Sequence, residues 1–225
     1  FGKAIITINK KFTIYAPNKK QMNILSYKNI LDNIKKIKPN YFIHSAALTA
    51  PMIQHENNSL KSIDTNIIGT ANVAKACQKE GVKLIYISTN FVYPGLKGKY
   101  KESDYLYPVN AYGWSKLGGE CSVILCKKSL ILRICMTEDI YPHKIAYDNY
   151  ITSFMKKTDT AKIILKTLDN VGIINIGGPA QTVYEYAKKY DKNVIKGFLN
   201  KKNVLLMGKN TSMNINKLKK IKIND

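Results

Sequence analysis

The chain alternates short apolar runs with segments of helical periodicity, and this alternation constrains its fold more than any other feature. Residues 40–44 and 82–87 have the pattern of short buried strands, and residues 64–77 between them carry apolar side chains at helical spacing. Strands that alternate with helices in this way lie parallel in one sheet. The sequence therefore predicts an α/β fold, a Rossmann-like doubly wound parallel sheet.

Small and polar residues follow both predicted strands at their carboxyl ends. The hydroxyl pair Ser88 and Thr89 ends the second strand, and Ser45, Ala46 and Ala47 follow the first. In open α/β sheets this edge is where ligands bind. The small residues leave room for a flat ligand to approach the backbone, so we expect a ligand site here.

A tyrosine and a lysine four residues apart, Tyr112 and Lys116, follow further along the chain. Residues at this spacing share one face of a helix, where an ammonium group can act on a phenol. A free phenol has a pKa of about 10, and a neighbouring cation lowers that pKa by stabilising the phenolate. We therefore expect Lys116 to make Tyr112 a usable proton donor. For the pair taken alone, a packed tyrosine on a surface helix is the alternative.

Five short motifs, in this order and spacing, resemble the extended short-chain dehydrogenase/reductase family. They are Ser45-Ala-Ala47, Thr65-Asn66, Ile87-Ser-Thr89, Val92-Tyr-Pro-Gly95 and Tyr112-x-x-x-Lys116. Within that family the chain bears its strongest likeness to the dTDP-4-dehydrorhamnose reductases and related sugar-nucleotide enzymes. Residues 173–179 and 211–219 also look like segments of the family's carboxyl-terminal half, so the resemblance covers nearly the whole chain.

The beginning of the chain departs from the family pattern. Family members carry a Gly-x-x-Gly-x-x-Gly loop there, and Gly2 would be the last of its three glycines. Such a loop brings backbone N–H groups against the cofactor pyrophosphate. We expect a partial sequence that lacks the first strand and most of this loop. The alternative is a natural chain that has lost cofactor binding.

The resemblance implies a nicotinamide cofactor, and the residues after a predicted strand at 11–16 bear on its identity. Where an acid normally accepts the ribose 2′-hydroxyl, this chain has Asn18, Lys19 and Lys20. Two ammonium groups and no carboxylate favour NADPH over NADH, although a solvated loop would have the same composition. The implied cofactor-binding residues are Gly2, Asn18, Lys19, Asn23, Ile24, Ala46, Ala47, Asn66, Tyr112 and Lys116.

The resemblance also implies the chemistry, which is hydride transfer to the C4 carbonyl of a 4-keto-6-deoxy sugar nucleotide while Tyr112 protonates the oxygen. Lys116 would bond the nicotinamide ribose as well, and Asn66 would support the centre from a neighbouring helix. The alternatives are that Thr89 caps the strand end and that Asn66 caps its helix. The implied catalytic residues are Thr89, Tyr112 and Lys116, and the implied substrate contacts are Thr89, Asn90 and Tyr112.

Two departures leave the sugar open, because Asn90 stands where relatives commonly have an acid and Met136 where they commonly have an aromatic residue. An epimerase or epimerase-reductase uses the same tyrosine and lysine and is an alternative enzyme. From a different class, the regulatory subunit of methionine adenosyltransferase resembles the same reductases and acts as a binding partner without catalysis.

Composition narrows the set of partners. A net charge of +21 would normally suggest nucleic acid, but the lysines are dispersed and Arg133 is the sole arginine, so we expect no nucleic-acid partner. No apolar run approaches a membrane span, and we expect a cytoplasmic protein without a membrane partner. A homodimer is left open.

We expect the four cysteines to be buried, reduced thiols. They are Cys77, Cys121, Cys126 and Cys135. The histidines, too scattered to predict a metal site, are His44, His55 and His143.

We expect two units, an NAD(P)-binding Rossmann-like domain at 1–135 and a small substrate lobe at 136–225 interleaved with it. A helix at 158–168, with an N-cap candidate at its start, and a strand at 173–176 are expected to return to the main domain. The tail beyond Gly208 is polar and lysine-rich, so we expect it to be only partly ordered.

Overall fold

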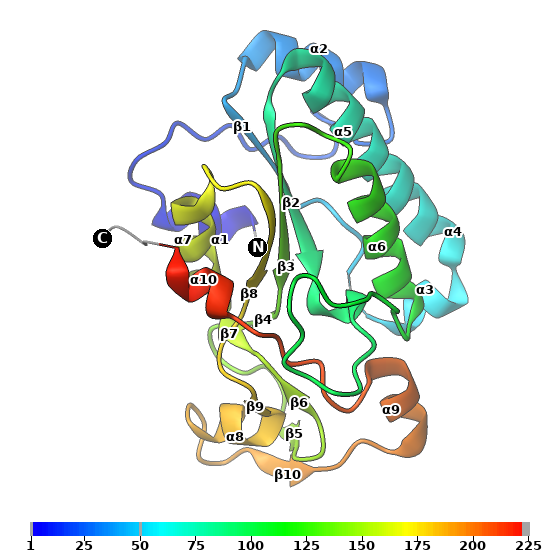
Figure 1. Cartoon of the computed structure of the whole chain (residues 1–225), viewed down its shortest axis with the longest axis vertical. Helices are drawn as coiled ribbons and strands as arrows, with labels where there is room; N and C mark the ends of the chain where they lie inside the picture. The colour runs from blue at the N-terminus through cyan, green and yellow to red at the C-terminus, as the bar shows by residue number, and fades with distance from the viewer. Residues whose placement is uncertain (1, 50, 222–225) are drawn as a thin grey trace.

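The computed structural model describes residues 2–49 and 51–221, and its centre is a sheet of four parallel strands (Figure 1). The strand order is β1-β2-β3-β8, with every neighbouring pair parallel. The strands are β1 (Tyr41–His44), β2 (Lys83–Thr89), β3 (Ser129–Ile134) and β8 (Gly172–Ile176). The predicted parallel α/β sheet is confirmed, as are the strands expected at 40–44, 82–87 and 173–176.

Helices cover both faces of the sheet because alternate side chains of each strand point to opposite sides. Leu84 and Tyr86 of β2 pack in one apolar cluster with α2, α5 and α6, whereas Ile85 and Ile87 pack in another with α7 and α10. The helix α1 packs against α7. The helices are α1 (Gly2–Ile8), α2 (Tyr27–Ile37), α5 (Gly69–Glu80), α6 (Ala111–Val123), α7 (Lys157–Thr167) and α10 (Asn216–Lys220).

The connection from β1 to β2 contains a π-helical turn, η1 (Ile63–Ile68), that leads directly into α5. It is preceded by the short helices α3 (Ile53–Asn57) and α4 (Ser59–Ser62). Turns of this kind are rare and frequently occur at functional sites. Here η1 carries Asn66, one of the predicted site residues.

A smaller group of elements lies beyond the carboxyl ends of the strands (Figure 1). In it β5 pairs with β10 and β6 with β9, while β4 pairs with β7 next to the main sheet. Its apolar cluster includes Ala146, Tyr150, Val183, Ala187, Val194 and Leu199. The remaining elements are η2 (Asn90–Val92), β4 (Met136–Thr137), β5 (Ile145–Tyr147), β6 (Ile151–Thr152), β7 (Met155–Lys156), β9 (Gln181–Thr182), α8 (Val183–Lys188), β10 (Ile195–Gly197) and α9 (Lys201–Met207).

The strand predicted at 11–16 does not form. A strand needs a neighbouring ladder to satisfy its backbone. Here the Asn9 side chain serves the backbone of Phe12 instead: it accepts the Phe12 N–H at 2.9 Å and donates to the Phe12 carbonyl at 2.6 Å. Phe12 meets β1 through an edge-to-face ring contact with Tyr41. This local bonding competes with strand formation.

Residues 209–221 of the tail, which was expected to be only partly ordered, pack against the rest of the chain, and residues 222–225 lie outside the described residues. Thr211 and Ser212 are fully buried. The Thr211 hydroxyl lies 3.0 Å from the Thr152 hydroxyl, and the Met213 N–H donates to the Ser153 hydroxyl at 3.0 Å. Hydrogen bonds to Thr152 and Ser153 therefore hold residues 211–213 in place, although the polar composition of the tail suggests solvent exposure.

Two further expectations are correct in the main and wrong in one detail each. The helix predicted at 158–168 is confirmed as α7, but its start is capped from outside, since Asp139 accepts the Thr158 N–H at 2.9 Å. Cys121 is exposed on α6, whereas the other three cysteines are buried as expected.

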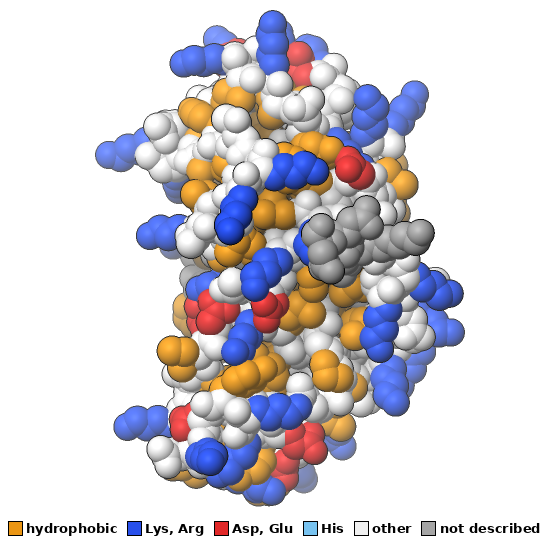
Figure 2. Space-filling view, turned by 90° about the vertical axis from the view of Figure 1, so that its left-hand side faces the viewer, with side chains coloured by type: hydrophobic (Ala, Val, Ile, Leu, Met, Phe, Trp, Pro, Cys, Tyr) orange, Lys and Arg blue, Asp and Glu red, His pale blue; other side chains and the backbone are white. Residues whose placement is uncertain are grey.

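Figure 2 shows lysine side chains spread over the face it views rather than gathered in one stripe. None of the helices in the described ranges is long and apolar enough to cross a membrane.

A buried ion pair ties α6 to the centre of the sheet. Arg133 of β3 and Glu120 of α6 are 2 % and 4 % exposed, and the Arg133 Nη2 lies 2.8 Å from the Glu120 Oε2. The Arg133 Nη1 also donates to the Tyr93 hydroxyl at 3.0 Å, and the Ser88 hydroxyl donates to Glu120. These hydrogen bonds compensate the desolvation of both charges.

Replacing Arg133 with methionine should lower the free energy of unfolding by about 3–5 kcal/mol, because Glu120 would stay buried without its cation. Urea denaturation followed by circular dichroism measures this change. The control is Lys97→Met, which removes a pair with Asp104 whose lysine side chain is 57 % exposed, and for which we expect less than about 1 kcal/mol. Equal losses in the two variants would contradict the assignment of the buried pair.

Candidate active site

The Tyr112 and Thr89 side chains meet at the carboxyl end of β2, close enough that Thr89 acts on the pKa of Tyr112 as a hydrogen-bond partner. Thr89 ends β2 and is 5 % exposed. Its Oγ1 also accepts the Phe91 N–H at 3.3 Å, which caps the turn η2. The cap role considered for Thr89 and its contact with Tyr112 are thus both present.

The first turn of α6 is fixed by residues on either side of Tyr112. Asn110 is the N-cap, and its Oδ1 accepts the Gly113 N–H at 2.7 Å. Glu56 of α3 accepts the Ala111 N–H at 2.8 Å. At Gly113 a Cβ would lie 2.4 Å from the Phe91 carbonyl oxygen, a clash that only glycine avoids. This close approach allows Tyr112 to reach Thr89.

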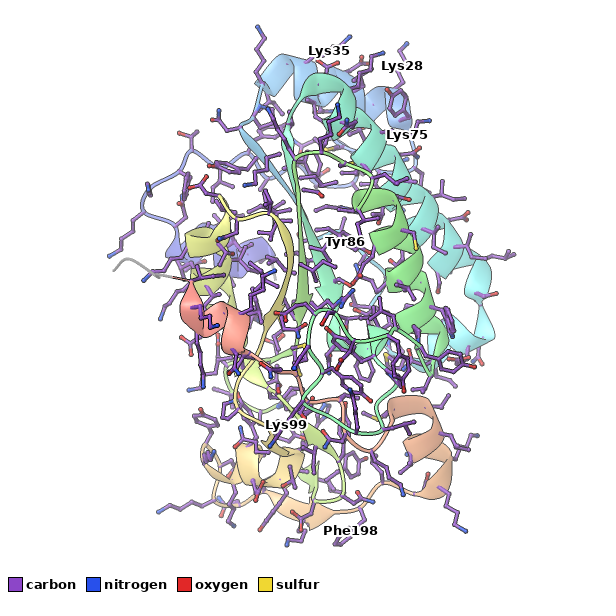
Figure 3. All side chains as sticks on the ribbon, in the orientation of Figure 1. Lys28, Lys35, Lys75, Tyr86, Lys99 and Phe198 are labelled. Atoms are coloured by element: carbon purple, nitrogen blue, oxygen red, sulfur yellow. The ribbon has the colours of Figure 1, made fainter. Side chains whose placement is uncertain are left out.

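Lys116 lies one turn after Tyr112, is 2 % exposed, and directs its ammonium group to another tyrosine. Its Nζ lies 4.2 Å from the ring centroid of Tyr86, which projects from β2 between the sheet and α6 (Figure 3). The Tyr86 hydroxyl donates to the Lys116 carbonyl at 3.2 Å. Burial lowers the pKa of Lys116 to about 7, although Glu120 acts in the opposite direction.

The expected effect of Lys116 on Tyr112 is absent here, which is a correction. Burial raises the pKa of Tyr112 to about 12, and the hydrogen bond from Thr89 acts against this rise. The i, i+4 spacing does place both side chains on one face of α6. However, the Lys116 side chain takes the orientation that stacks it on Tyr86, a cation–π contact.

Asn66 is fully buried in η1 and bonds the loop after β1 to α6. Its Oδ1 accepts the Leu48 N–H at 2.8 Å and its Nδ2 donates to the Leu48 carbonyl at 3.0 Å. The same Nδ2 donates to the Ser115 hydroxyl at 2.8 Å, which in turn donates to the Tyr112 carbonyl. Asn66 thus supports the Tyr112 backbone through Ser115 rather than capping its own helix.

Asn90, expected to contact substrate, is 3 % exposed and faces the smaller group of elements. Its Nδ2 lies 3.5 Å from the Thr152 Oγ1 and 3.4 Å from the Thr211 carbonyl oxygen. It therefore joins the end of β2 to β6 and to the chain near its carboxyl end.

Besides Asn66, Tyr112 and Lys116, the residues predicted to bind cofactor fall into two groups. Exposed Ala46 and half-buried Ala47 follow β1, and a Cβ on Gly2 would lie 3.8 Å from the Ser45 hydroxyl, so these residues share the edge that carries Thr89. The second group is Asn18, Lys19, Asn23 and Ile24. Across the described ranges their hydrogen bonds run to residues of 18–29 and to Asn72 of α5, away from Tyr112.

The site includes residues that the sequence analysis did not single out for it. His55 of α3 packs its ring against Tyr112, with centroids 5.0 Å apart. Asn110 and Glu56 fix the start of α6, and Glu120 faces Lys116. Asparagine three residues before Gly113 is a recognisable N-cap signal, whereas His55 and Glu56 carry no local signal because their contacts are made across 55 or more residues.

Comparisons with known proteins agree with this geometry. Residues 2–171 match the model of the RmlD substrate binding domain family. The chain is 30% identical over 179 residues to a dTDP-4-dehydrorhamnose reductase of Aggregatibacter actinomycetemcomitans, covering 78% of this chain and 56% of the relative. It is 34% identical over 103 residues to the methionine adenosyltransferase 2 subunit beta of Xenopus laevis, covering 46% of this chain and 30% of the relative. The chain thus spans about half or less of the length of these relatives.

A solved structure extends the likeness to three dimensions. The dTDP-4-dehydrorhamnose reductase of Bacillus anthracis, in complex with NADP, superimposes with a TM-score of 0.85 at 25% sequence identity. The match covers 97% of this chain and 86% of that one. The resemblance stated from the sequence motifs is therefore confirmed.

The stability of the protein should carry a pH dependence that comes from Lys116. Its pKa falls from 10.5 to about 7 on folding, so between these values the unfolded chain holds a proton that the folded chain has released. The contribution of Lys116 to stability must then rise with pH. Relative to Lys116→Met, the wild type should gain free energy of unfolding between about pH 7 and pH 9.5, measured by urea denaturation.

The control for this measurement is Lys75→Met, which removes an exposed cation–π contact with Tyr27 at 4.9 Å. A wild-type minus Lys116→Met difference that stays flat with pH would refute the lowered pKa.

Proposed function

The chain belongs to the RmlD substrate binding domain family, and we propose that it reduces a 4-keto-6-deoxy sugar nucleotide with NADPH, as an oxidoreductase of the extended short-chain type. The observation that carries this proposal is the meeting of Thr89 and Tyr112 at the carboxyl end of β2, where Thr89 acts on the Tyr112 pKa, with Lys116 one turn away. A phenol held by a hydroxyl at that edge can give its proton to a substrate oxygen placed between the two groups.

Tyr112 keeps its proton over a wide pH range because its pKa is about 12. It is therefore a donor rather than a base before reaction, which suits protonation of an oxygen as the carbonyl is reduced. In this proposal the Thr89 hydroxyl donates to the substrate oxygen that Tyr112 protonates, and so orients it. Lys116, with a pKa of about 7, can take up and release a proton near neutral pH, with its amine directed to Tyr86 rather than to Tyr112.

The residues on this edge fit a nicotinamide cofactor, which supplies the hydride when bound. The small exposed residues after β1 leave the backbone accessible, and Asn66 ties that loop to α6 through Leu48 and Ser115. We propose that Gly2, Ala46, Ala47 and Lys116 hold the nicotinamide half of the cofactor and its phosphates. Asn18, Lys19, Asn23 and Ile24 are proposed for the adenosine half.

Thr89, Asn90 and Tyr112 are proposed substrate contacts, with Asn90 acting from the junction with β6. The division at residue 135, with residues 136–225 as a substrate lobe, stays a prediction. We further propose that the protein acts in the cytoplasm and that its product serves the synthesis of surface polysaccharides.

The match to methionine adenosyltransferase 2 subunit beta favours a second candidate, a regulatory binding protein without catalysis. Against it stands the presence of Thr89, Tyr112 and Lys116 together, since a binding protein has no chemical need for a proton donor beside a lysine of lowered pKa. The reductase function requires the hydroxyl oxygen of Tyr112, whereas the regulatory function does not.

Tyr112→Phe removes that oxygen and should lower kcat by at least about 100-fold, because proton transfer from a positioned donor contributes a factor of this size. The assay follows NADPH oxidation at 340 nm by the full-length protein with a panel of 4-keto-6-deoxy sugar nucleotides. Tyr105→Phe, at a tyrosine that is 64 % exposed, is the matched control. Absence of turnover and of NADPH binding in the wild type would favour the regulatory role.

Lys19 and Lys20 give a separate test of cofactor choice. If their ammonium groups pair with the 2′-phosphate, Lys19→Ala with Lys20→Ala should raise the Kd for NADPH and leave that for NADH nearly unchanged. Fluorescence titration of the two cofactors measures both constants. The control pair is Lys35→Ala with Lys36→Ala, which removes two lysines from the last turn of α2. An unchanged Kd for NADPH would show that the loop is merely solvated, and equal rises for NADPH and NADH would show that the lysines do not read the 2′-phosphate.

A further inference from the structure

The short helices before η1 make direct contact with the start of α6, where the proposed proton donor lies. The Glu56 carboxylate of α3 accepts the Ala111 N–H at 2.8 Å. The ring of the neighbouring His55 lies against the Tyr112 ring, with centroids 5.0 Å apart and planes inclined by 54°. Two consecutive residues of α3 thus act on two consecutive residues of α6.

His55 is held from behind by a hydrogen bond. Its side chain is fully buried, and its Nδ1 lies 2.8 Å from the hydroxyl of Ser62, which is 2 % exposed. This bond fixes the plane of the imidazole, which an apolar ring of similar size could not achieve. His55 therefore presents a rigid surface to Tyr112.

The burial of the other ring nitrogen of His55 costs free energy. Within the part of the chain that the structure describes, the Nε2 of His55 makes no hydrogen bond of normal length and angle, although the Thr49 carbonyl acts on the ring as an acceptor. A buried polar atom without a partner is unfavourable, so the arrangement does not serve stability alone. The packing of the His55 ring against Tyr112, which fixes the position of the phenol, offsets this cost.

A second ring contacts Tyr112 from another element. Phe91 of η2 meets it edge to face, with centroids 6.2 Å apart and planes at 73°. Thr89 acts on the hydroxyl of Tyr112 and lowers its pKa. The phenol is thereby contacted on its ring by His55 and Phe91 and at its oxygen by Thr89.

We propose that His55, held by Ser62, is a positioning residue for Tyr112, which it keeps in the orientation that brings its hydroxyl to Thr89. This inference rests on the proposed function of Tyr112 as proton donor. In this proposal His55 acts through the ring of Tyr112, which it contacts.

The proposal has a consequence for pH dependence. Burial lowers the pKa of His55 from 6.5, while the Thr49 carbonyl and the Glu56 carboxylate act in the opposite direction. The titratable groups that face it are Tyr112 from α6 and Glu56 from its own helix. Protonation in acid would place a charge in this buried contact, so kcat should fall below pH 6.5 as His55 titrates.

Steady-state kinetics of the full-length protein test the proposal. We expect His55→Ala to lower kcat about 10-fold or more with KM for the sugar nucleotide nearly unchanged, because a displaced donor reacts slowly without binding substrate less well. His55→Phe keeps a ring, should lose less activity, and should lack the acid limb of the pH profile. His143→Ala is the control, since that exposed histidine contacts Tyr141 at a similar centroid distance of 5.5 Å.

Unchanged kcat in His55→Ala, or an acid limb retained in His55→Phe, would overturn the proposal. Where His55→Ala fails to fold, Ser62→Ala leaves the ring in place and removes its anchor, and a pH profile identical to that of the wild type would overturn the proposal equally. A readout without turnover separates its failure from that of the proposed function. In the NMR spectrum of the histidine rings, Tyr112→Leu should shift the His55 signal and leave that of His143 in place. A wild type without turnover defeats the proposed function, whereas an unshifted His55 signal defeats the contact itself.

Discussion

The buried ion pair between Glu120 and Arg133 is the interaction on which the candidate site depends, because it sets the rotation of α6 against the sheet. Tyr112, Lys116 and Glu120 follow one another at four-residue spacing, so they share a face of that helix. Once Glu120 is bonded to Arg133 and Ser88 beneath the sheet edge, Lys116 must lie over Tyr86 and Tyr112 must lie near the end of β2. A different rotation of α6 would bury a charge without a partner, which is strongly unfavourable.

Glycine makes this close approach possible. At Gly119 a Cβ would lie 2.3 Å from the Tyr86 hydroxyl and 2.8 Å from the Asn66 carbonyl oxygen, and at Gly113 it would meet the Phe91 carbonyl. These two positions bring α6 against β2, η1 and η2 at once. The hydrogen bonds that cross these contacts, from Asn66 to Ser115 and from Tyr86 to the Lys116 carbonyl, need that short separation.

Local features of the site could be predicted from the sequence, and contacts between distant segments could not. The strand that ends in Thr89 follows from its apolar run, the shared helix face of Tyr112 and Lys116 follows from their spacing, and the ligand-binding sheet edge follows from parallel topology. The direction of the Lys116 ammonium depends on a ring from β2, which spacing along α6 does not encode. The strand expected at 11–16 failed for the same reason, because a strand requires a partner and residues 9–12 satisfy one another locally. His55 was set aside as a scattered histidine, although its ring lies against Tyr112.

Burial shifts the two central groups of the site toward their neutral forms, and this bears on how the proposed proton transfer proceeds. The pKa of Tyr112 rises to about 12 and that of Lys116 falls to about 7. Between these values the phenol holds its proton and the amine has released one, so a chain of net charge +21 keeps an uncharged pair at its candidate centre. A phenolate formed there would be costly unless a proton or a hydrogen bond reached it. Thr89 opposes that cost, since it acts on Tyr112 as a hydrogen-bond partner that lowers its pKa. In the proposed reaction, the phenolate charge that burial opposes would then exist only during proton transfer.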